Sequence, residues 1–359
     1  MKEKVVVGMS GGVDSSVAAY LLKEQGYDVI GVTMQIWQQQ DCKTTAQEGG
    51  CCGSSAVDDA RRVAAQLDIP YYVMNFRQQF QEHVIDYFIR EYRLGRTPNP
   101  CIACNRFVKW EALLQRSLGI GADYIATGHY AKIIQLASRR YTLRQSDSAK
   151  DQTYALYSLT QDQLKHTLFP IGDYTKDQVR SIAKQAGLNV ADKPDSQEIC
   201  FVPDHDYAAF ISRTTGTAEP EGNFVTADGT VLGRHKGISH YTVGQRKGLG
   251  IALGKPVFVT AIRTDTNEVV IGTNEDLMVT ELAADTMNYM AADSLSPGRH
   301  MTAKIRYSHK GEACVLTDVS ADGSRVRLRF DRPVRAVTPG QAVVLYEDGC
   351  VLGGGIIVS

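Results

Sequence analysis

A loop rich in glycine and serine follows the first apolar run of the chain, residues 5–7. A strand that ends in such a loop, with a helix after it, directs backbone N–H groups and the amino end of the helix at one point, where they attract anions. Gly11 and Gly12 allow unusual backbone dihedral angles and close approach of a ligand to the backbone. The loop therefore predicts a site for phosphate or pyrophosphate. Its residues are Gly8, Met9, Ser10, Gly11, Gly12, Val13, Asp14 and Ser15.

Three polar side chains of this loop are candidates for ligand binding. Ser10 and Ser15 can add hydroxyl donors, and Asp14 can cap the helix or help to hold Mg²⁺ against the phosphates. No Gly-Lys-Ser/Thr follows, so the loop is not a Walker A sequence, and it does not match the GxGxxG pattern of dinucleotide-binding folds. These residues predict a nucleotide-phosphate site and leave the second substrate open.

Two cysteines lie where their thiols could act as nucleophiles. Two prolines predict an extended approach along residues 95–100, after which a helix is expected to begin at Cys104 and Asn105. A thiol at the amino end of a helix is stabilised as the thiolate and becomes a better nucleophile. Cys200 lies in a second polar segment, residues 195–201.

The other cysteines are expected to be less reactive. Eight cysteines in a long chain without a secretory signal favour metal binding or catalysis, rather than a disulfide framework, for those that cluster. Cys314 and Cys350 lie in apolar runs typical of strands and are expected to be packed. Cys51 and Cys52 are expected to be adjacent thiols at the surface.

Composition favours a soluble globular protein with two or three domains, since the chain has 359 residues, 43% hydrophobic and 22% charged. It has no apolar run long enough to span a membrane and no secretory signal, so a cytoplasmic protein is expected. The net charge is −1, but residues 299–335 contain nine Lys or Arg against four Asp or Glu. This local excess is typical of a solvated strand face or of a surface that binds nucleic acid.

The first part of the chain alternates between continuous apolar runs and helical spacing. This alternation predicts an α/β domain with a doubly wound parallel sheet, covered by helices on both faces. The expected strands are residues 5–7, 28–34, 71–76 and 124–127, and the expected helices are residues 15–25, 54–67, 79–94 and 108–118.

From about residue 205 the pattern changes to short β-like runs separated by glycines. Runs at 224–226, 257–262 and 269–271 predict a small β-rich central domain, and five later runs predict a C-terminal antiparallel β-barrel. The later runs are residues 301–307, 313–318, 325–330, 342–346 and 351–358. The expected domains are residues 1–204, 205–282 and 283–359.

Six motifs resemble those of one family, in its order and over nearly the whole chain. The loop at 8–15 alone resembles the SGGxDS loop of PP-loop ATP pyrophosphatases, which include NAD, GMP, asparagine and argininosuccinate synthetases. With five further motifs, the chain resembles the tRNA-specific 2-thiouridylases. The motifs are GMSGGVDS from residue 8, TPNPxxxCN from 97, ATGHYA from 126, KDQxY from 150, DSxxICF from 195 and YTVGQRKGLGI from 241.

The resemblance implies a PP-loop ATP pyrophosphatase domain and an ATP-dependent reaction at the wobble uridine of tRNA. ATP, with Mg²⁺, adenylates the C2 oxygen, and a persulfide on Cys200 delivers sulfur to C2. Cys104 is implied as the partner thiol, which ends in a disulfide with Cys200 or releases the sulfur from it. A sulfur-donor protein, such as a cysteine desulfurase or a sulfur-relay protein, would load the persulfide. Residues 8–15, Met34 and Gly128 are implied as ATP contacts.

The resemblance also implies a set of tRNA contacts. Arg and Lys neutralise phosphates, and a flipped-out base needs a pocket reached by short side chains. The basic excess at 299–335 then fits the barrel as a clamp on the anticodon stem. His129 on its own would be interpreted as an ordinary histidine bonded to the backbone. The implied contacts are Asn99, Pro100 and Cys101 at the target base, then His129, Lys150, Asp151, Gln152, Arg306, Tyr307 and Gln341.

The chain departs from the family at Cys101, where many members have Asp. Cys101 cannot replace a carboxylate as acid or base, and it forms a Cys-x-x-Cys pair with Cys104. With Cys200, these thiols could ligate an iron–sulfur cluster that leaves one iron open. The favoured hypothesis is a persulfide mechanism on Cys104 and Cys200, with no metal-binding residues, because thiol exchange needs no added cofactor.

Two other functions fit part of the sequence. An ATP-dependent amidating synthetase could use the same loop, but it needs an ammonia source or a glutaminase region, and no such segment is apparent. A non-catalytic RNA-binding protein could use the barrel alone, but it would not need the pyrophosphatase loop.

Overall fold

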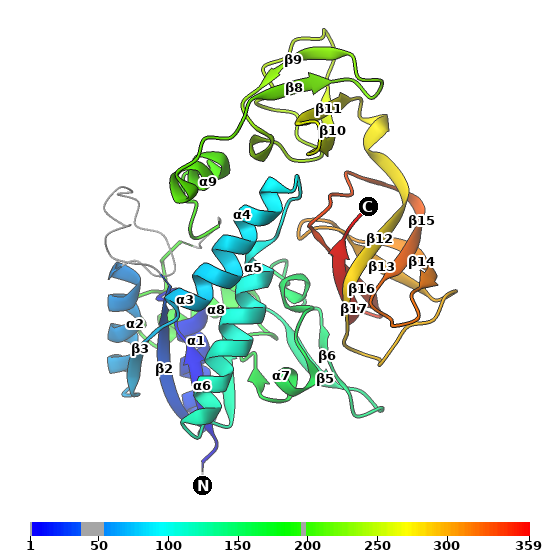
Figure 1. Ribbon diagram of the computed structural model, residues 1–359. Coiled ribbons are helices and arrows are strands. Elements are labelled where there is room, and N and C mark those ends of the chain that lie inside the picture. Colours follow the sequence, from blue (N-terminus) through cyan, green and yellow to red (C-terminus); the bar gives the residue numbers. More distant parts are fainter. Residues whose placement is uncertain (1, 37–53, 195–198) are drawn as a thin grey trace. The chain divides into compact units, whose positions relative to one another are not determined.

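The computed structural model describes residues 2–36, 54–194 and 199–359 (Figure 1). The chain forms two compact units. The first comprises Met1–Val84, Cys101–Pro203 and Gly349–Val351, and the second comprises Ile85–Pro100, Asp204–Asp348 and Leu352–Ser359. In the described part of the chain, no helix is long and apolar enough to cross a membrane.

A five-stranded parallel sheet forms the centre of the first unit, with the strand order β3-β2-β1-β4-β7. This sheet confirms the predicted α/β architecture, and the four predicted strands lie within two residues of the observed bounds. The strands are β1 (Lys4–Gly8), β2 (Asp28–Gln35), β3 (Tyr71–Asn75), β4 (Tyr124–Thr127) and β7 (Thr167–Leu168).

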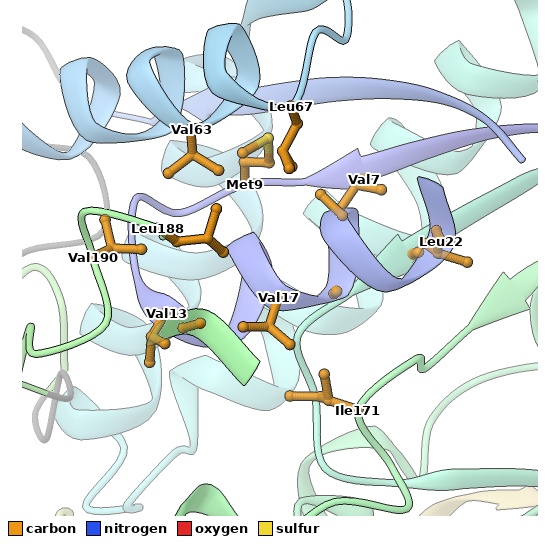
Figure 2. Packing of buried hydrophobic residues seen from close by; sticks show 14 of the residues in the cluster. Val7, Met9, Val13, Val17, Leu22, Val63, Leu67, Ile171, Leu188 and Val190 are labelled. Atoms are coloured by element: carbon orange, nitrogen blue, oxygen red, sulfur yellow. The ribbon is translucent and has the colours of Figure 1, made fainter. Parts of the chain in front are cut away.

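Helices cover both faces of this sheet. On one face, Val5 and Val7 pack in a core with α1 (Val13–Glu24), α2 (Ser54–Gln66) and α8 (Lys176–Gln185), as Figure 2 shows in part. On the other face, a Cβ added to Gly8 would lie 3.8 Å from Cδ2 of Leu113. Continuous apolar strands such as 5–7 need cover on both sides, which explains this layered arrangement.

The helix that carries Cys104 begins earlier than predicted. It starts with α5 (Pro100–Ala103), continues through a π-helical stretch, η3 (Cys104–Leu113), and ends with α6 (Leu114–Gly119). The predicted start at Cys104 is therefore wrong by four residues. Proline is well suited to the first helical position, where no N–H is needed for the helix and φ is already near −65°.

A second long helix matches the prediction for residues 79–94. It consists of α3 (Arg77–Phe80), the π-helical η2 (Gln81–Ile85) and α4 (Asp86–Arg93). Several shorter elements were not predicted from the sequence. They are β5 (Lys132–Gln135), β6 (Tyr141–Arg144), η4 (Thr153–Leu156), α7 (Gln161–Lys165), α8 and α9 (Tyr207–Thr215).

The second unit contains a small mixed sheet in the central part of the chain. Its order is β10-β11-β8-β9, in which β11 and β8 are parallel and the other pairs are antiparallel. Phe224, Tyr241 and Val259 lie in its core. The strands are β8 (Gly222–Val225), β9 (Val231–His235), β10 (Phe258–Arg263) and β11 (Glu268–Gly272), and a short helix, η5 (Ile238–His240), lies between β9 and β10 in the sequence.

A closed antiparallel barrel of six strands follows, which confirms the predicted C-terminal barrel. The ring closes because β12 pairs with both β15 and β17. All five predicted runs correspond to strands, and only β12 was not predicted. The strands are β12 (Met278–Tyr289), β13 (His300–Lys304), β14 (Glu312–Val319), β15 (Val326–Arg335), β16 (Ala342–Glu347) and β17 (Cys350–Ile357).

Candidate active site

The glycine-rich loop lies at the point where the strand order of the parallel sheet reverses. The chain passes from β1 to β2 on one side, and β4 later pairs with β1 on the other side. Crevices at such switch points, beyond the carboxyl ends of the strands, are the usual ligand sites of open α/β sheets. Gly8 at the end of β1 pairs with Thr127 at the end of β4, so the loop and Gly128 follow neighbouring strands at the same edge of the sheet.

The conformation of the loop depends on glycine. Gly11 has a φ of +71°, and a Cβ on it would lie 2.2 Å from the carbonyl oxygen of Ala56. Gly12 is the N-cap of α1 in an extended conformation, without a side-chain cap. The backbone N–H of Ser10 donates to Oγ of Ser15 over 3.1 Å, which folds the loop over the start of the helix.

Met9 and Val13 contribute to the loop by packing. The side chains of both are buried in the core under the loop. The backbone of Met9 is also fixed, because its N–H donates to the Val32 carbonyl over 2.8 Å and its carbonyl accepts from the Thr33 hydroxyl over 2.7 Å. Met34, the predicted contact near the end of β2, is half-buried.

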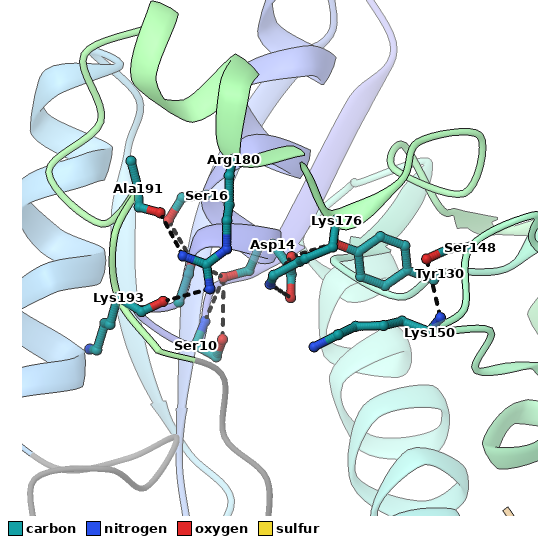
Figure 3. A network of polar contacts seen from close by, with 12 residues as sticks. Ser10, Asp14, Ser16, Tyr130, Ser148, Lys150, Lys176, Arg180, Ala191 and Lys193 are labelled. Carbon is teal, nitrogen blue, oxygen red and sulfur yellow. Dashed lines mark hydrogen bonds and ion pairs between the residues drawn. The ribbon is translucent and has the colours of Figure 1, made fainter. Parts of the chain in front are cut away.

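Asp14 does not cap α1, which corrects one of its two expected roles. Its carboxylate instead forms an ion pair with Lys176, with Nζ 2.7 Å from Oδ1 and 2.9 Å from Oδ2 (Figure 3). The hydroxyl of Tyr130 also donates to Oδ1 over 2.7 Å. Lys176 is the first residue of α8, whose start is fixed by a reciprocal capping box between Thr175 and Gln178.

Two further cationic residues hold the other side of the loop. Nζ of Lys193 donates to the Gly11 carbonyl over 3.1 Å and to Oδ2 of Asp59 over 2.7 Å. The Arg180 guanidinium donates to the carbonyls of Ala191 and Lys193, over 3.2 Å each, which fixes the segment that carries Lys193 (Figure 3). Two lysine–aspartate ion pairs therefore flank the loop, one between Lys176 and Asp14 and one between Lys193 and Asp59.

Gly128 is in close contact with the first turn of α1. A Cβ at this position would lie 2.6 Å from both the carbonyl carbon of Asp14 and the backbone nitrogen of Ser15. Such a separation is well inside van der Waals contact, so only glycine lets the end of β4 approach the loop.

His129 is a neutral imidazole in an aromatic environment. Its Nδ1 is 2.7 Å from the Thr127 hydroxyl, and its ring lies 5.6 Å from that of Trp110 and 6.0 Å from that of Phe169. Burial, and secondarily the positive charge of Lys109, hold the pKa of His129 well below its usual value. His129 thus bonds to the side chain of Thr127, whereas an ordinary histidine was expected to bond to the backbone.

The segment Lys150-Asp151-Gln152 lies beside the same site. Gln152 exchanges two hydrogen bonds with Tyr130, since its N–H donates to the Tyr130 carbonyl and its Oε1 accepts from the Tyr130 N–H, each over 2.9 Å. The Asp151 carboxylate accepts from the Ser146 N–H and the Thr153 hydroxyl. Only Lys150 of the three is exposed, and Figure 3 shows its side chain extending below Tyr130.

The three candidate cysteines differ in their exposure to solvent. Cys104 and Cys200 are half-buried and Cys101 is exposed. Since the helix begins at Pro100, Cys104 lies just past its first turn, where the field of the helix end falls off, so that predicted source of thiolate stabilisation is weak. Phe201, next to Cys200, packs edge-to-face on Phe80 at 5.8 Å.

The contact between Phe201 and Phe80 brings the segment of Cys200 against α3. Phe80 ends α3, and α3 packs against η3, which begins with Cys104. Within the described residues, no three His, Cys, Asp or Glu side chains are grouped closely enough to hold a metal ion. Cys101, Cys104 and Cys200 therefore do not form a three-thiolate site in this structure.

The other cysteines differ in their surroundings. Cys314 is buried as predicted, and burial raises the pKa of its thiol to about 12. Cys350 is half-buried at the start of β17, where it pairs with Arg144. Cys51 and Cys52 lie outside the described residues.

The remaining predicted contacts belong to the second unit. Nε2 of Gln341 donates to the Thr97 carbonyl over 2.8 Å, which places it beside the segment that contains Asn99 and Pro100. Arg306 donates one N–H to the Arg335 carbonyl over 3.0 Å, and the side chain of Tyr307 is 46% exposed.

Comparison with known proteins identifies the family. Residues 3–204, 208–273 and 279–357 match the models described as tRNA methyl transferase HUP domain, tRNA methyl transferase PRC-barrel domain and aminomethyltransferase beta-barrel domain. The tRNA-specific 2-thiouridylase MnmA of Lachnoclostridium phytofermentans is 64% identical over 358 residues, which cover 99% of this chain and 100% of that protein. The chain belongs to the tRNA-specific 2-thiouridylase family. The proteins of the same name from Clostridium perfringens (strain 13) and Clostridium beijerinckii are 57% and 56% identical, over 100% of this chain and 99% of each.

Membership of the 2-thiouridylase family confirms the resemblance inferred from the motifs. It does not identify the residues around the loop that sequence reasoning missed, namely Lys176, Lys193, Arg180, Tyr130 and Asp59. Lys193 lies just ahead of the motif with Cys200, and Tyr130 lies within ATGHYA, so their positions could have suggested a role. Lys176 had one local signal, the Thr-x-x-Gln capping pattern that starts its helix.

Substitution of Gly128 by Ala should weaken binding of a non-hydrolysable ATP analogue by about tenfold or more. The added Cβ must displace the first turn of α1, and overpacking of this kind costs about 1–3 kcal/mol. Gly119→Ala is a matched control, because a Cβ there meets no atom within 4 Å. Calorimetric titration of both variants checks the prediction, and wild-type affinity in Gly128→Ala would contradict it.

Proposed function

We infer that this protein is an ATP-dependent tRNA 2-thiouridylase, which replaces the C2 oxygen of the wobble uridine by sulfur and releases AMP and pyrophosphate. The observation that carries this conclusion is full-length identity of 56–64% to 2-thiouridylases, together with an intact glycine-rich loop at the switch point of the sheet. The three proposed domains are residues 1–204, 205–282 and 283–359. We also propose that the protein acts in the cytoplasm.

Adenylation comes first in this mechanism. The uridine O2 attacks the α-phosphorus of ATP, the bond to the β-phosphate oxygen breaks, and pyrophosphate leaves. The loop at residues 8–15 provides backbone N–H groups and the Ser10 and Ser15 hydroxyls for the phosphates. Lys176 and Lys193 place positive charge beside the loop, where negative charge builds up on the leaving pyrophosphate. The proposed adenine contacts are Met34 and Gly128.

Asp14 is the residue that would hold Mg²⁺ with ATP. Magnesium in nucleotide sites commonly binds one or two carboxylates together with phosphate oxygens, so a single loop carboxylate fits this ion. When bound, the ion would neutralise phosphate charge. Lys176 and Tyr130 orient the Asp14 carboxylate, since both hydrogen-bond to its oxygens.

Sulfur transfer follows on two thiols. A donor protein, such as a cysteine desulfurase or a sulfur-relay protein, loads Cys200 as a persulfide. The terminal sulfur attacks C2, and AMP leaves with the original oxygen. The Cys104 thiolate then attacks Sγ of Cys200, forming a disulfide and leaving the sulfur on the uridine. An external thiol must reduce the disulfide before the next turnover.

The proposed RNA surface combines the target-base segment with the barrel. Asn99, Pro100 and Cys101 contact the target base, and His129 and residues 150–152 lie near the nucleotide. Because His129 is held neutral, it can donate one hydrogen bond and accept another without adding charge.

On the barrel, Arg306, Tyr307 and Gln341 are the proposed tRNA contacts. The alternating burial of β15 supports a basic outer face, because Arg327 and Arg329 are exposed between buried apolar residues. These arginines belong to the local charge excess at 299–335, which suits phosphates of the anticodon stem.

Reaction of the purified protein with ATP, a sulfur source and bulk tRNA tests this function. We expect pyrophosphate release and 2-thiouridine among the wobble nucleosides by mass spectrometry. Release of pyrophosphate without a thiolated nucleoside would favour an amidating synthetase. Binding of tRNA without cleavage of ATP would favour a non-catalytic RNA-binding protein.

Cys104→Ser and Cys200→Ser should each abolish formation of 2-thiouridine while tRNA-dependent pyrophosphate release persists, because adenylation uses neither thiol. Cys350→Ser makes the same chemical change at the start of β17 and serves as the control, since Cys350 has no proposed role in sulfur transfer. Cys101→Asp should retain activity under the two-thiol mechanism and lose it if three thiolates hold a cluster. Nucleoside mass spectrometry and a pyrophosphate assay measure both steps, and full thiolation by Cys200→Ser would exclude both mechanisms.

Arg306→Ala should weaken tRNA binding and reduce the slope of log K against log[salt] by about one, as expected for loss of one phosphate contact. Arg61→Ala, which removes an exposed arginine of α2, is the control. Binding titrations from low to high salt provide the slope. Equal slopes for wild type and Arg306→Ala would show that this side chain does not neutralise a phosphate.

A further inference from the structure

The part of the chain that forms the small central sheet contains a run of positive charge without negative charge. Residues 229–264 contain six Lys or Arg and no Asp or Glu. Two of the six form ion pairs with carboxylates outside this run, Arg234 with Glu221 over 3.4 Å and Arg263 with Glu268 over 3.3 Å. The middle of the run is the motif at 241–251, to which the proposed function assigns no role.

Residues 242–250, which we call the basic loop, follow η5 and are held at their base by β10. The Gly244 N–H donates to the Val259 carbonyl over 2.8 Å, and the Val259 N–H donates to the Gln245 carbonyl over 3.0 Å. The side chain of Gln245 adds two bonds, since its Oε1 accepts from the Thr242 N–H and its Nε2 donates to the Lys247 carbonyl, each over 3.0 Å. These four bonds fix the backbone of the first half of the basic loop.

The basic loop is anchored a second time directly after its two cations, Arg246 and Lys247. Leu249 is buried in the core of the small sheet, and Gly248 and Gly250 on either side of it have φ values of +77° and +68°. The side chains of Arg246 and Lys247 are exposed, and neither forms an ion pair in the part of the chain that the structure describes. Both cations therefore lie on a short tip between two anchors.

The base of the basic loop also contacts the end of β15 in the barrel, which belongs to the same unit. Gly244 has a φ of +90°, and a Cβ on it would lie 2.9 Å from Cβ of Ala336. Nη2 of Arg335 donates to the Gly244 carbonyl over 3.5 Å, and its guanidinium lies 4.9 Å from the ring centre of Phe258. Arg306, a proposed tRNA contact, donates to the Arg335 carbonyl over 3.0 Å. The basic loop and Arg306 thus contact one and the same residue of the barrel.

These charges indicate what the basic loop can bind. Arg has a planar fork of donors that matches phosphate oxygens, and Lys provides a compact positive charge. A tip whose backbone is already fixed loses little conformational entropy when it binds. Exposed ionic contacts are individually weak, which favours a polyanion that meets several cations at once, and RNA releases counterions at each phosphate that is neutralised.

We propose that Arg246 and Lys247 form a second phosphate-binding site for RNA, which extends the RNA surface of the barrel from Arg306 onto the small central sheet. This inference rests on the proposed function, which takes tRNA as the substrate. The site binds the phosphodiester backbone, so it contributes affinity without selecting a base sequence.

Binding of end-labelled bulk tRNA to the full-length protein over a series of salt concentrations tests the site. For the double variant Arg246→Gln/Lys247→Gln we expect the slope of log K against log[salt] to decrease by about two, one for each lost contact. The affinity at about 0.1 M salt should fall about tenfold or more, because a contact of this kind loses its effect only near 1 M salt.

Two further variants separate a phosphate site from other causes. Arg213→Gln/Arg234→Gln removes the same net charge from the same unit, but its two arginines are exposed and ion-paired to Asp204 and Glu221, so the slope should stay unchanged. Arg246→Lys/Lys247→Arg keeps both charges in the basic loop and should retain the wild-type slope. A merely structural role of the two side chains would not be rescued by this exchange.

An unchanged slope in Arg246→Gln/Lys247→Gln overturns the proposal, as does an equal decrease in Arg213→Gln/Arg234→Gln. If the wild type forms no 2-thiouridine while the slope still depends on Arg246 and Lys247, the RNA site stands and the assigned reaction is wrong. If the wild type thiolates tRNA and the slope does not depend on these residues, the reaction stands and the RNA site is wrong.

Discussion

The conformation around the glycine-rich loop depends on a steric constraint, since the end of β4 and the first turn of α1 lie too close for a side chain to fit between them. Gly128 meets this constraint, and Gly11 meets a similar one against the carbonyl of Ala56. Because the strand end lies so close to the helix, Tyr130, two residues after Gly128, reaches Asp14 with its hydroxyl. The same strand end carries His129 into its aromatic surroundings. Backbone proximity at one glycine thus places the loop carboxylate and its partners.

Features that depend on local sequence could be predicted, and features that depend on distant pairs could not. The parallel sheet follows from apolar runs such as 5–7, and the barrel follows from the alternation that leaves Arg327 and Arg329 outside. The ion pair of Asp14 and Lys176 joins residues 162 positions apart. The capping pattern of Thr175 and Gln178 marks Lys176 as the start of a helix, but no local pattern shows which distant carboxylate it meets. The same holds for Gln341, which contacts a residue 244 positions away.

One prediction failed for a local reason. The prolines at 98 and 100 predict an extended approach that ends before Cys104, but the second proline starts the helix itself. Proline favours both extended backbone and the first helical position, so the sequence alone does not decide between them. The difference matters chemically, because it moves Cys104 out of the first turn and leaves Cys101 within it.

The first unit is completed by residues near the carboxyl end of the chain. Gly349 accepts a hydrogen bond from the N–H of Gln145, and Val351 accepts one from the buried hydroxyl of Thr142, both over less than 3 Å. During synthesis on the ribosome, β6 therefore waits for its neighbouring strand until residues 349–351 have been translated. Until then its outer edge has unpaired backbone groups, which favour association with other nascent chains. A message truncated before codon 349 would thus leave a defect in the first unit as well as in the barrel, far along the sequence from the missing residues.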